Sequence, residues 1–207
     1  MRLEPFADLL AEAIGLDPAA LVAEVAGYEA LIVRSATKVT REVLAAGKKL
    51  KIVGRAGAGV DNIDVKAAAE RGVVVTNTPG GNSAAVAELA IGMMFALARS
   101  LPRADAAMKQ GQWLQKELEG RELGGKTLGL VGIGNVGAIV ARLARAVGMK
   151  VVAYDPYVTA ERAREVGAEL AGLEAVLAAS DYLSVHVPKS KETAGMIGAA
   201  ALAKAKR

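Results

Sequence analysis

Three glycines near the middle of the chain have the spacing of a phosphate-binding turn. Gly132, Gly134 and Gly137 form the pattern G-x-G-x-x-G, directly after the apolar run TLGLV. In such a turn the first glycine permits a tight bend and the second lets a pyrophosphate approach the backbone. The third lets the following helix pack closely on the strand. Because the N–H groups and the dipole at the start of that helix attract phosphates, the spacing predicts a dinucleotide site.

An acidic residue at the end of the next apolar run identifies the dinucleotide. Asp155 lies 18 positions beyond Gly137 and closes the run KVVAY. A carboxylate there accepts hydrogen bonds from the adenine ribose hydroxyls and repels a 2′-phosphate, so NAD is favoured over NADP. Three glycines alone can simply mark a tight turn. The preceding strand, the following helix and the acid make the functional interpretation the stronger one.

The elements that must position these residues alternate between strand and helix. Apolar runs without strict alternation are typical of strands covered on both faces. Helical stretches between them begin at polar caps and end near glycines. This order predicts an α/β fold with parallel sheets and right-handed crossovers. Strands are predicted at residues 30–34, 50–55, 73–76, 127–133, 150–155 and 182–187, and helices from Pro18, at 41–46, 65–71, 84–100, from Pro102, and at 136–147, 160–166 and 173–179.

Two domains are predicted, with a boundary near Pro79. Residues 1–78 contain the first three predicted strands, and residues 79–207 contain the glycine turn. Between these strands and the glycine turn, residues 83–125 interrupt the alternation of strand and helix with two predicted helices and the only Trp. The expected domains are therefore 1–78 and 79–207.

Composition excludes several classes of function. The sequence has no cysteine, which rules out disulfides, thiolate metal sites and a Cys nucleophile, and no metal site is predicted. No apolar run reaches the roughly 20 residues that a bilayer requires. The start of the chain lacks the pattern of a signal peptide. We therefore expect a cytoplasmic protein without a membrane partner.

The charge balance points to small anions rather than nucleic acid. The formal net charge is +4, but Lys and Arg do not cluster with aromatic residues. Nucleic-acid binding is therefore not expected. A basic excess does help to attract a small anionic substrate.

Several motifs in a fixed order carry a family resemblance. RSATKV begins at Arg34, GRAGAGVDNID at Gly54 and NTPGGNSAAVAELAIGMMFALAR at Asn77. GKTLGLVGIGNVG, YDPY and SDYLSVHVP follow at residues 125, 154 and 180. Together, over about residues 16–198, they resemble the D-2-hydroxyacid dehydrogenase family, and within it the branch that acts on 3-phosphoglycerate.

The resemblance implies a fold and an activity. The fold would be a partial flavodoxin-like substrate domain followed by a Rossmann-type NAD domain truncated in its C-terminal half, with helices on both faces of parallel sheets. The activity would be NAD-dependent oxidation of 3-phosphoglycerate to 3-phosphohydroxypyruvate in serine biosynthesis. Two alternatives stay open. One is another D-2-hydroxyacid dehydrogenase, acting on glyoxylate or D-lactate, and the other is a non-catalytic NAD-binding or dimerisation module.

Site residues are implied by the matching motifs. Guanidinium groups pair well with carboxylates and phosphates, which suits two arginines in the substrate loops, although both could be ordinary surface charges. The expected substrate-binding residues are Arg34, Ser35, Arg55, Gly57 and Ala58. The expected cofactor-binding residues are Ala58, Gly132, Gly134, Asn135, Val136, Gly137, Asp155, His186, Val187 and Pro188.

Two residues of the cofactor set, Asn135 and His186, differ from a simple backbone contact. Asn135 stands where the family usually has an Arg beside the pyrophosphate, so NAD binding is expected to be modestly weaker. His186, the only histidine, is interpreted as a packed strand residue rather than a catalyst.

The chain departs from the family at both ends. The family's catalytic Arg, Glu and acid–base His have no counterpart within residues 1–207, so no catalytic residue is assigned and almost no turnover is expected. The family's opening strand is missing, and residues 1–15 are interpreted as the remnant of its first helix. Pairing into a homodimer through residues 82–113 is expected. A helix buried within its own subunit is the alternative for that stretch.

Overall fold

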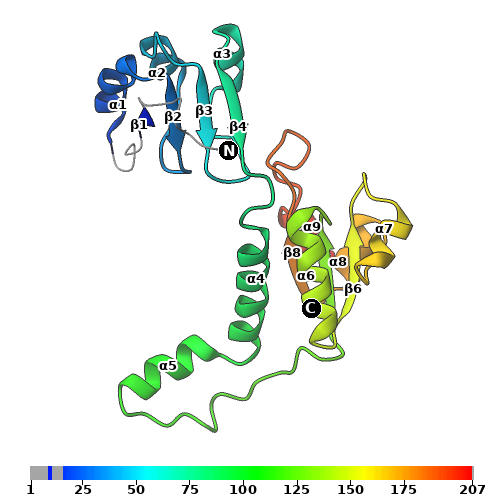
Figure 1. Ribbon diagram of the computed structural model, residues 1–207. Coiled ribbons are helices and arrows are strands. Elements are labelled where there is room, and N and C mark those ends of the chain that lie inside the picture. Colours follow the sequence, from blue (N-terminus) through cyan, green and yellow to red (C-terminus); the bar gives the residue numbers. More distant parts are fainter. Residues whose placement is uncertain (1–8, 11–15, 207) are drawn as a thin grey trace. The chain divides into compact units, whose positions relative to one another are not determined.

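Two parallel sheets of four strands each organise the residues that the structure describes, which are 9–10 and 16–206. The structure is a computed structural model, and it divides into one unit over Met1–Asn82 and a second over Ser83–Arg207 (Figure 1). The expected α/β class with parallel strands is confirmed.

The first unit has the strand order β1-β2-β3-β4. Its helices begin where a side chain accepts hydrogen bonds from free N–H groups. Asp17 accepts from Ala19 and Ala20 at 2.8 and 2.9 Å. The elements are β1 (Leu9–Leu10), α1 (Pro18–Glu24), the 3₁₀ turn η1 (Val25–Gly27), β2 (Ala30–Val33), α2 (Arg41–Ala46), β3 (Ile52–Arg55), α3 (Val65–Glu70) and β4 (Val74–Asn77).

The interpretation of residues 1–15 as a helix remnant is wrong where the structure describes them. Leu9 and Leu10 form β1, which pairs parallel with Ala30 and Leu31 of β2. The physical reason is the free edge of β2, whose N–H and C=O groups are satisfied by any strand that adds to it. The other residues of that prediction, 1–8 and 11–15, lie outside the described part of the chain.

One face of the first sheet carries the core of its unit. Leu31 and Val53 are paired in register and fully buried beneath the helices, with Leu21 of α1 and Leu44 of α2 in the same cluster. Side chains alternate between the two faces of a strand. Ile32 therefore points to the opposite face, where it is 43% exposed. The sheet is packed most tightly on its helix-covered side.

The second unit places the glycine turn beside the centre of its sheet. The strand order is β7-β6-β5-β8, so the chain leaves β5 for β6 on one side and later returns to β8 on the other. Ligands bind beyond the carboxyl ends of parallel strands at such a switch in strand order. The elements are α4 (Ser83–Ala98), α5 (Leu101–Lys109), β5 (Thr127–Val131), α6 (Asn135–Ala146), β6 (Lys150–Tyr154), α7 (Ala160–Glu165), β7 (Glu169–Leu170), α8 (Leu173–Ala179), β8 (Tyr182–Val185) and α9 (Ala199–Leu202).

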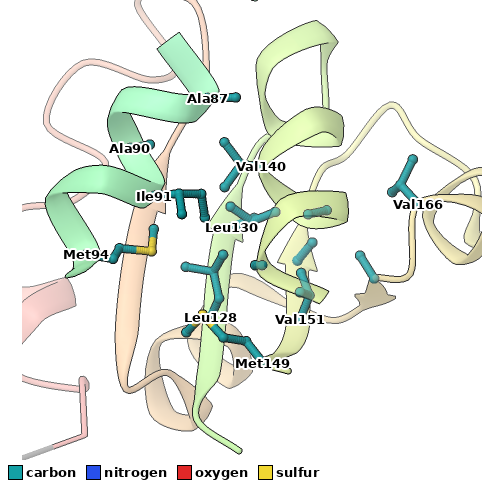
Figure 2. Packing of buried hydrophobic residues seen from close by; sticks show 14 of the residues in the cluster. Ala87, Ala90, Ile91, Met94, Leu128, Leu130, Val140, Met149, Val151 and Val166 are labelled. Carbon is teal, nitrogen blue, oxygen red and sulfur yellow. The ribbon is translucent and has the colours of Figure 1, made fainter. Parts of the chain in front are cut away.

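Helices cover both faces of this second sheet. Figure 2 shows Ile91 and Met94 of α4 reaching toward Leu130 of β5 and Val140 of α6, all of them buried. On the other face α8 packs against β5, and a Cβ on Gly129 would lie 3.0 Å from Cγ1 of its Val176. Because apolar burial contributes about 25 cal/mol per Å², these contacts hold β5 and the turn after it in place.

Among the described residues, no single helix is both long and apolar enough to cross a bilayer. The helices α4 and α5, which are bent by 69° relative to each other, reach the required length and composition only when counted together.

Candidate functional site

Two of the three glycines in the turn are required by close contacts. Gly132 follows β5 with φ +95°, and its N–H donates to the Tyr154 carbonyl at 2.8 Å. A Cβ on Gly132 would lie 2.7 Å from the His186 carbonyl oxygen. A Cβ on Gly137 would lie 2.1 Å from the Gly132 carbonyl oxygen. Side chains at these two positions would therefore push the turn away from β8 and from α6.

The remaining glycine faces open space. A Cβ on Gly134 would meet no protein atom within 4 Å, and the residue is exposed at the N-cap of α6. No side chain caps this helix start in the described structure. The first N–H groups of a helix have no partner within the helix, so they are available to a ligand here. This is a cradle of the kind that accepts a pyrophosphate.

Asp155 lies directly against the turn. Its Oδ2 accepts from the Ile133 N–H at 2.8 Å, and its Oδ1 accepts from the Tyr157 N–H at 2.9 Å. Val131 and Tyr154 are register partners in β5 and β6, and this pairing brings Asp155, the next residue after Tyr154, to the turn that follows Val131. Since each carboxylate oxygen can accept more than one hydrogen bond, both retain capacity for ribose hydroxyls. The acid is held in place before any ligand arrives.

His186 packs beneath the same turn. Its N–H donates to the Val131 carbonyl at 2.8 Å, and its Nε2 lies 2.8 Å from the Ser184 Oγ. Burial lowers the pKa of this imidazole below its ordinary value of 6.5, because desolvation disfavours the charged ring. The ring is therefore mostly neutral at pH 7.

The remaining residues predicted to bind the cofactor differ in their surroundings. Cγ1 of Val187 lies 3.0 Å from the position of a Cβ on Gly132, so this side chain packs against the glycine turn. Asn135 is exposed in the first turn of α6, whereas Val136 is half-buried against the core. The carbonyl of Pro188, itself exposed, accepts from the Thr193 hydroxyl at 2.6 Å. The structure thus places Asn135, but not Val136, where its side chain is free to reach a ligand.

In the first unit, Arg55 is folded back over a glycine. Its Nη1 donates to the Ala56 carbonyl at 2.6 Å, and its Nε donates to Oδ1 of Asn62 at 3.4 Å. A Cβ on Gly57 would lie 1.7 Å from Nη1. Glycine at this position therefore permits the observed placement of the guanidinium group.

The loop after β2 lies beside that of Arg55. The carbonyl of the exposed Arg34 accepts from Nδ2 of Asn62 at 3.0 Å. The Ala58 carbonyl accepts a hydrogen bond from Nδ2 of Asn77 at 2.6 Å. The loops carrying the predicted substrate residues are therefore tied to neighbouring strands and loops through asparagine side chains.

A cavity of about 690 Å³ opens next to these loops. It brings Ser35 together with Lys38, but the predicted residues Arg34, Arg55, Gly57 and Ala58 do not line it. Its charged lining residues are Lys38, Arg41, Glu42, Asp61 and Asp64. Because acids outnumber bases, this lining does not by itself favour an anion.

Asn62, Asn77 and Ser184 were missed by reasoning from the sequence. All three lie inside motifs that the sequence displays, GRAGAGVDNID, NTPGG and SDYLSVHVP. Motif membership was the only signal, because spacing along the chain does not show which distant carbonyl or ring an amide or hydroxyl will contact. Over the described residues, no group of three or more His, Asp or Glu side chains is arranged to hold a metal ion.

Known proteins that resemble this chain include an NAD-binding domain, in agreement with the dinucleotide site described above. Residues 91–207 match the family described as D-isomer specific 2-hydroxyacid dehydrogenase, NAD binding domain. A D-3-phosphoglycerate dehydrogenase from Archaeoglobus fulgidus is 52% identical over 184 residues, which are 89% of this chain and 35% of that protein. A hydroxypyruvate reductase from Thermotoga maritima is 49% identical over 86% of this chain and 57% of that protein.

A solved structure shares the fold. The D-lactate dehydrogenase from Aquifex aeolicus, crystallised with NAD and lactic acid, superposes with a TM-score of 0.80 at 32% identity, over 96% of this chain and 57% of that one. The chain spans about a third of the length of the phosphoglycerate dehydrogenases that it matches. The glycine cradle and the fixed Asp155 fit the cofactor of the matched domain, which is NAD. The chain belongs to the D-isomer specific 2-hydroxyacid dehydrogenases, and more than half of it is their NAD-binding domain.

Proposed function

We propose that this chain forms the substrate-binding and NAD-binding parts of a D-3-phosphoglycerate dehydrogenase, which oxidises 3-phosphoglycerate to 3-phosphohydroxypyruvate in serine biosynthesis. The observation that carries the proposal is the glycine turn with Asp155 bonded to its Ile133 N–H. The 52% identity to the Archaeoglobus fulgidus enzyme supports the choice of substrate. We assign residues 1–78 to substrate binding and residues 79–207 to NAD binding.

The residues of the turn bind and orient the cofactor. When bound, NAD supplies a hydride acceptor for the carbon that carries the substrate hydroxyl. The free N–H groups at the start of α6 bind the pyrophosphate, and Gly134 leaves room for it. Asp155 binds the adenine ribose hydroxyls and excludes a 2′-phosphate. Residues 186–188 border the cofactor, and Asn135 donates one hydrogen bond without adding charge.

Arginines capture the acid. Arg34 and Arg55 bind the carboxylate and the phosphate of the substrate through charge-assisted hydrogen bonds. Ser35 contributes a hydroxyl, and Gly57 and Ala58 contribute backbone groups. The fixed guanidinium of Arg55 favours binding, because less side-chain freedom is lost when the ligand arrives.

The 207-residue chain binds ligands with almost no turnover in this proposal. We assign none of residues 1–207 to the family's catalytic Arg, Glu or His, and positioned acid–base catalysis is worth about 10²–10⁴ in rate. An assay of the purified chain with NAD and 3-phosphoglycerate, followed by NADH absorbance, should give a rate near background. A robust rate would overturn this part of the proposal.

A second hydroxyacid substrate is the rival, supported by the Thermotoga maritima reductase at 49% identity. The experiment is a calorimetric titration of the chain with 3-phosphoglycerate, D-glycerate, D-lactate, glyoxylate and hydroxypyruvate. Because 3-phosphoglycerate and D-glycerate differ only by the phosphate, we expect the phosphorylated acid to bind at least tenfold more tightly. Tighter binding of any unphosphorylated acid would favour the rival. A chain that binds NAD but binds none of these acids would favour a non-catalytic module.

We further propose a homodimer through residues 82–113. Leu89, Met93 and Leu97 of α4 are 62%, 54% and 75% exposed, on the side away from its buried residues, and Trp113 is 74% exposed. An exposed apolar surface of this kind is typical of a protein interface. Sedimentation of the chain should give a dimer, and replacement of Leu97 by Lys should shift it toward the monomer. A monomeric parent chain would contradict this assignment.

A further inference from the structure

One asparagine side chain joins the two loops to which substrate capture is assigned. Nδ2 of Asn62 donates to the carbonyls of Arg34 and Thr37 at 3.0 and 2.7 Å. Its Oδ1 accepts from Nε of Arg55 at 3.4 Å. A single half-buried side chain therefore contacts the loop after β2 twice and the arginine at the end of β3 once.

The residue type suits this task. A side-chain amide offers two donor hydrogens and an acceptor oxygen, and all three functions are used here. A carboxylate could accept from Arg55 but could not donate to the two carbonyls. An alanine could do neither, so residues 34–37 and the Arg55 guanidinium would lose the contact that they share through Asn62.

The backbone of Asn62 is held by separate bonds. Its carbonyl accepts from the Val39 N–H at 2.8 Å, and the Asp64 N–H donates to the Val39 carbonyl at 2.9 Å. These bonds form the parallel bridge between Val39 and Ile63. Because they involve no side-chain atom of Asn62, they remain when that side chain is truncated, and the unit should still fold.

We propose that Asn62 is a positioning residue, which holds the Arg55 guanidinium and the backbone of residues 34–37 in the one arrangement that receives an anionic acid. This inference rests on the proposed function, which assigns acid binding to these loops. Fixing both loops in advance lowers the entropy lost on binding. Asn62 contacts no reacting atom in this proposal and acts only through Arg34 and Arg55.

The test uses the whole 207-residue chain with the Asn62→Ala substitution. Titration calorimetry with 3-phosphoglycerate should show about tenfold weaker binding than the parent chain. Titration with NAD should be unchanged within twofold, because every residue assigned to NAD except Ala58 lies in the other unit. The matched control is Asp17→Ala, which removes the cap of α1 in the same unit and should weaken acid binding by less than twofold. Equal acid affinity in Asn62→Ala and the parent chain would overturn the proposal.

A spectroscopic measurement separates failure of this proposal from failure of the proposed function. If the parent chain binds no 3-phosphoglycerate, the proposed function fails, and the ¹⁵N-labelled Nε–H signal of Arg55 then tests positioning directly. That signal should be observable in the parent chain and in Asn62→Asp, which keeps an acceptor, and lost to solvent exchange in Asn62→Ala. If Asn62→Ala does not fold, Asn62→Asp replaces it, and unimpaired acid binding by that variant overturns the proposal. An unchanged Arg55 signal in Asn62→Ala would also overturn it.

Discussion

The two regions proposed to bind ligands differ in which atoms of the polypeptide shape them. The turn at residues 132–137 is made of backbone, with two glycines in close contact with neighbouring carbonyls and a third facing open space. The loops at residues 34–37 and 55–58 are held by the side chain of Asn62. The comparison shows that one region depends on the absence of side chains and the other on the presence of one.

This difference decides how each region should respond to substitution. In the backbone-built turn an added methyl group should be costly wherever it meets a fixed carbonyl. In the loops held by side chains, truncation should leave the fold intact and change only the placement of Arg34 and Arg55.

The largest effect is expected at Gly137. In Gly137→Ala the new Cβ would lie 2.1 Å from the Gly132 carbonyl oxygen, so the backbone must shift. We expect the second unit to lose about 3 kcal/mol of unfolding free energy and NAD binding to be lost. Thermal unfolding and calorimetric titration with NAD measure the two effects.

Gly134→Ala is the matched control. Its Cβ meets no protein atom within 4 Å, and its φ of −68° suits alanine. The unfolding temperature should therefore stay nearly unchanged, while NAD affinity falls about tenfold because the methyl group occupies the path of the pyrophosphate. Equal effects of the two substitutions on stability would break the distinction between a packed glycine and an open one.

The next effect is expected at Asp155. In Asp155→Ala the Ile133 N–H loses its acceptor and the ribose loses its carboxylate. NAD affinity should fall about tenfold or more, and the preference for NAD over NADP should largely disappear. Parallel titrations with both dinucleotides give the ratio. An unchanged preference would rule out the ribose role of this acid.

A smaller and more selective effect is expected in the first unit. Arg34→Ala and Arg55→Ala should each weaken binding of 3-phosphoglycerate about tenfold, because each removes a charge-assisted contact. NAD affinity should be unchanged within twofold. Loss of both ligands together would indicate a folding defect instead of a role in substrate capture.

The contrast also explains what could be predicted from the sequence. The six predicted strands are present with ends within two residues, since buried apolar runs and polar caps act locally. The two strands that were missed, β1 and β7, have two residues each and form by adding to a sheet edge. No local pattern encodes such an addition.

The same reasoning applies to the site. Gly132 and Gly137 could be found because their role is a backbone requirement at fixed spacing. Asn62 could not, because its contact with the Arg34 carbonyl joins residues 28 positions apart. Likewise, the fixed position of Arg55 depends on Gly57 and Asn62 together, which neither residue reveals alone.

The smallest effect is expected from pH. Burial lowers the pKa of His186 below 6.5. As the pH falls, this imidazole therefore takes up a proton at a higher pH in the unfolded chain than in the folded chain. Stability of the second unit should therefore decline slightly as the pH falls below about 6.5. The ring signal of this only histidine, followed by NMR, should titrate below the ordinary value. The pKa of Asp181 is lowered by Lys206 from 3.8, so its contribution is lost only in a more acidic range. A midpoint above 6.5 for His186 would contradict its burial beneath the turn.

The most direct test of the central claim is an amide NMR titration of the 207-residue chain with NAD. Saturable amide shifts are expected at residues 132–137, Asp155, His186 and Val187, with the first unit's strands β2 and β3 unaffected. The absence of binding, or shifts that spare the glycine turn, would contradict it.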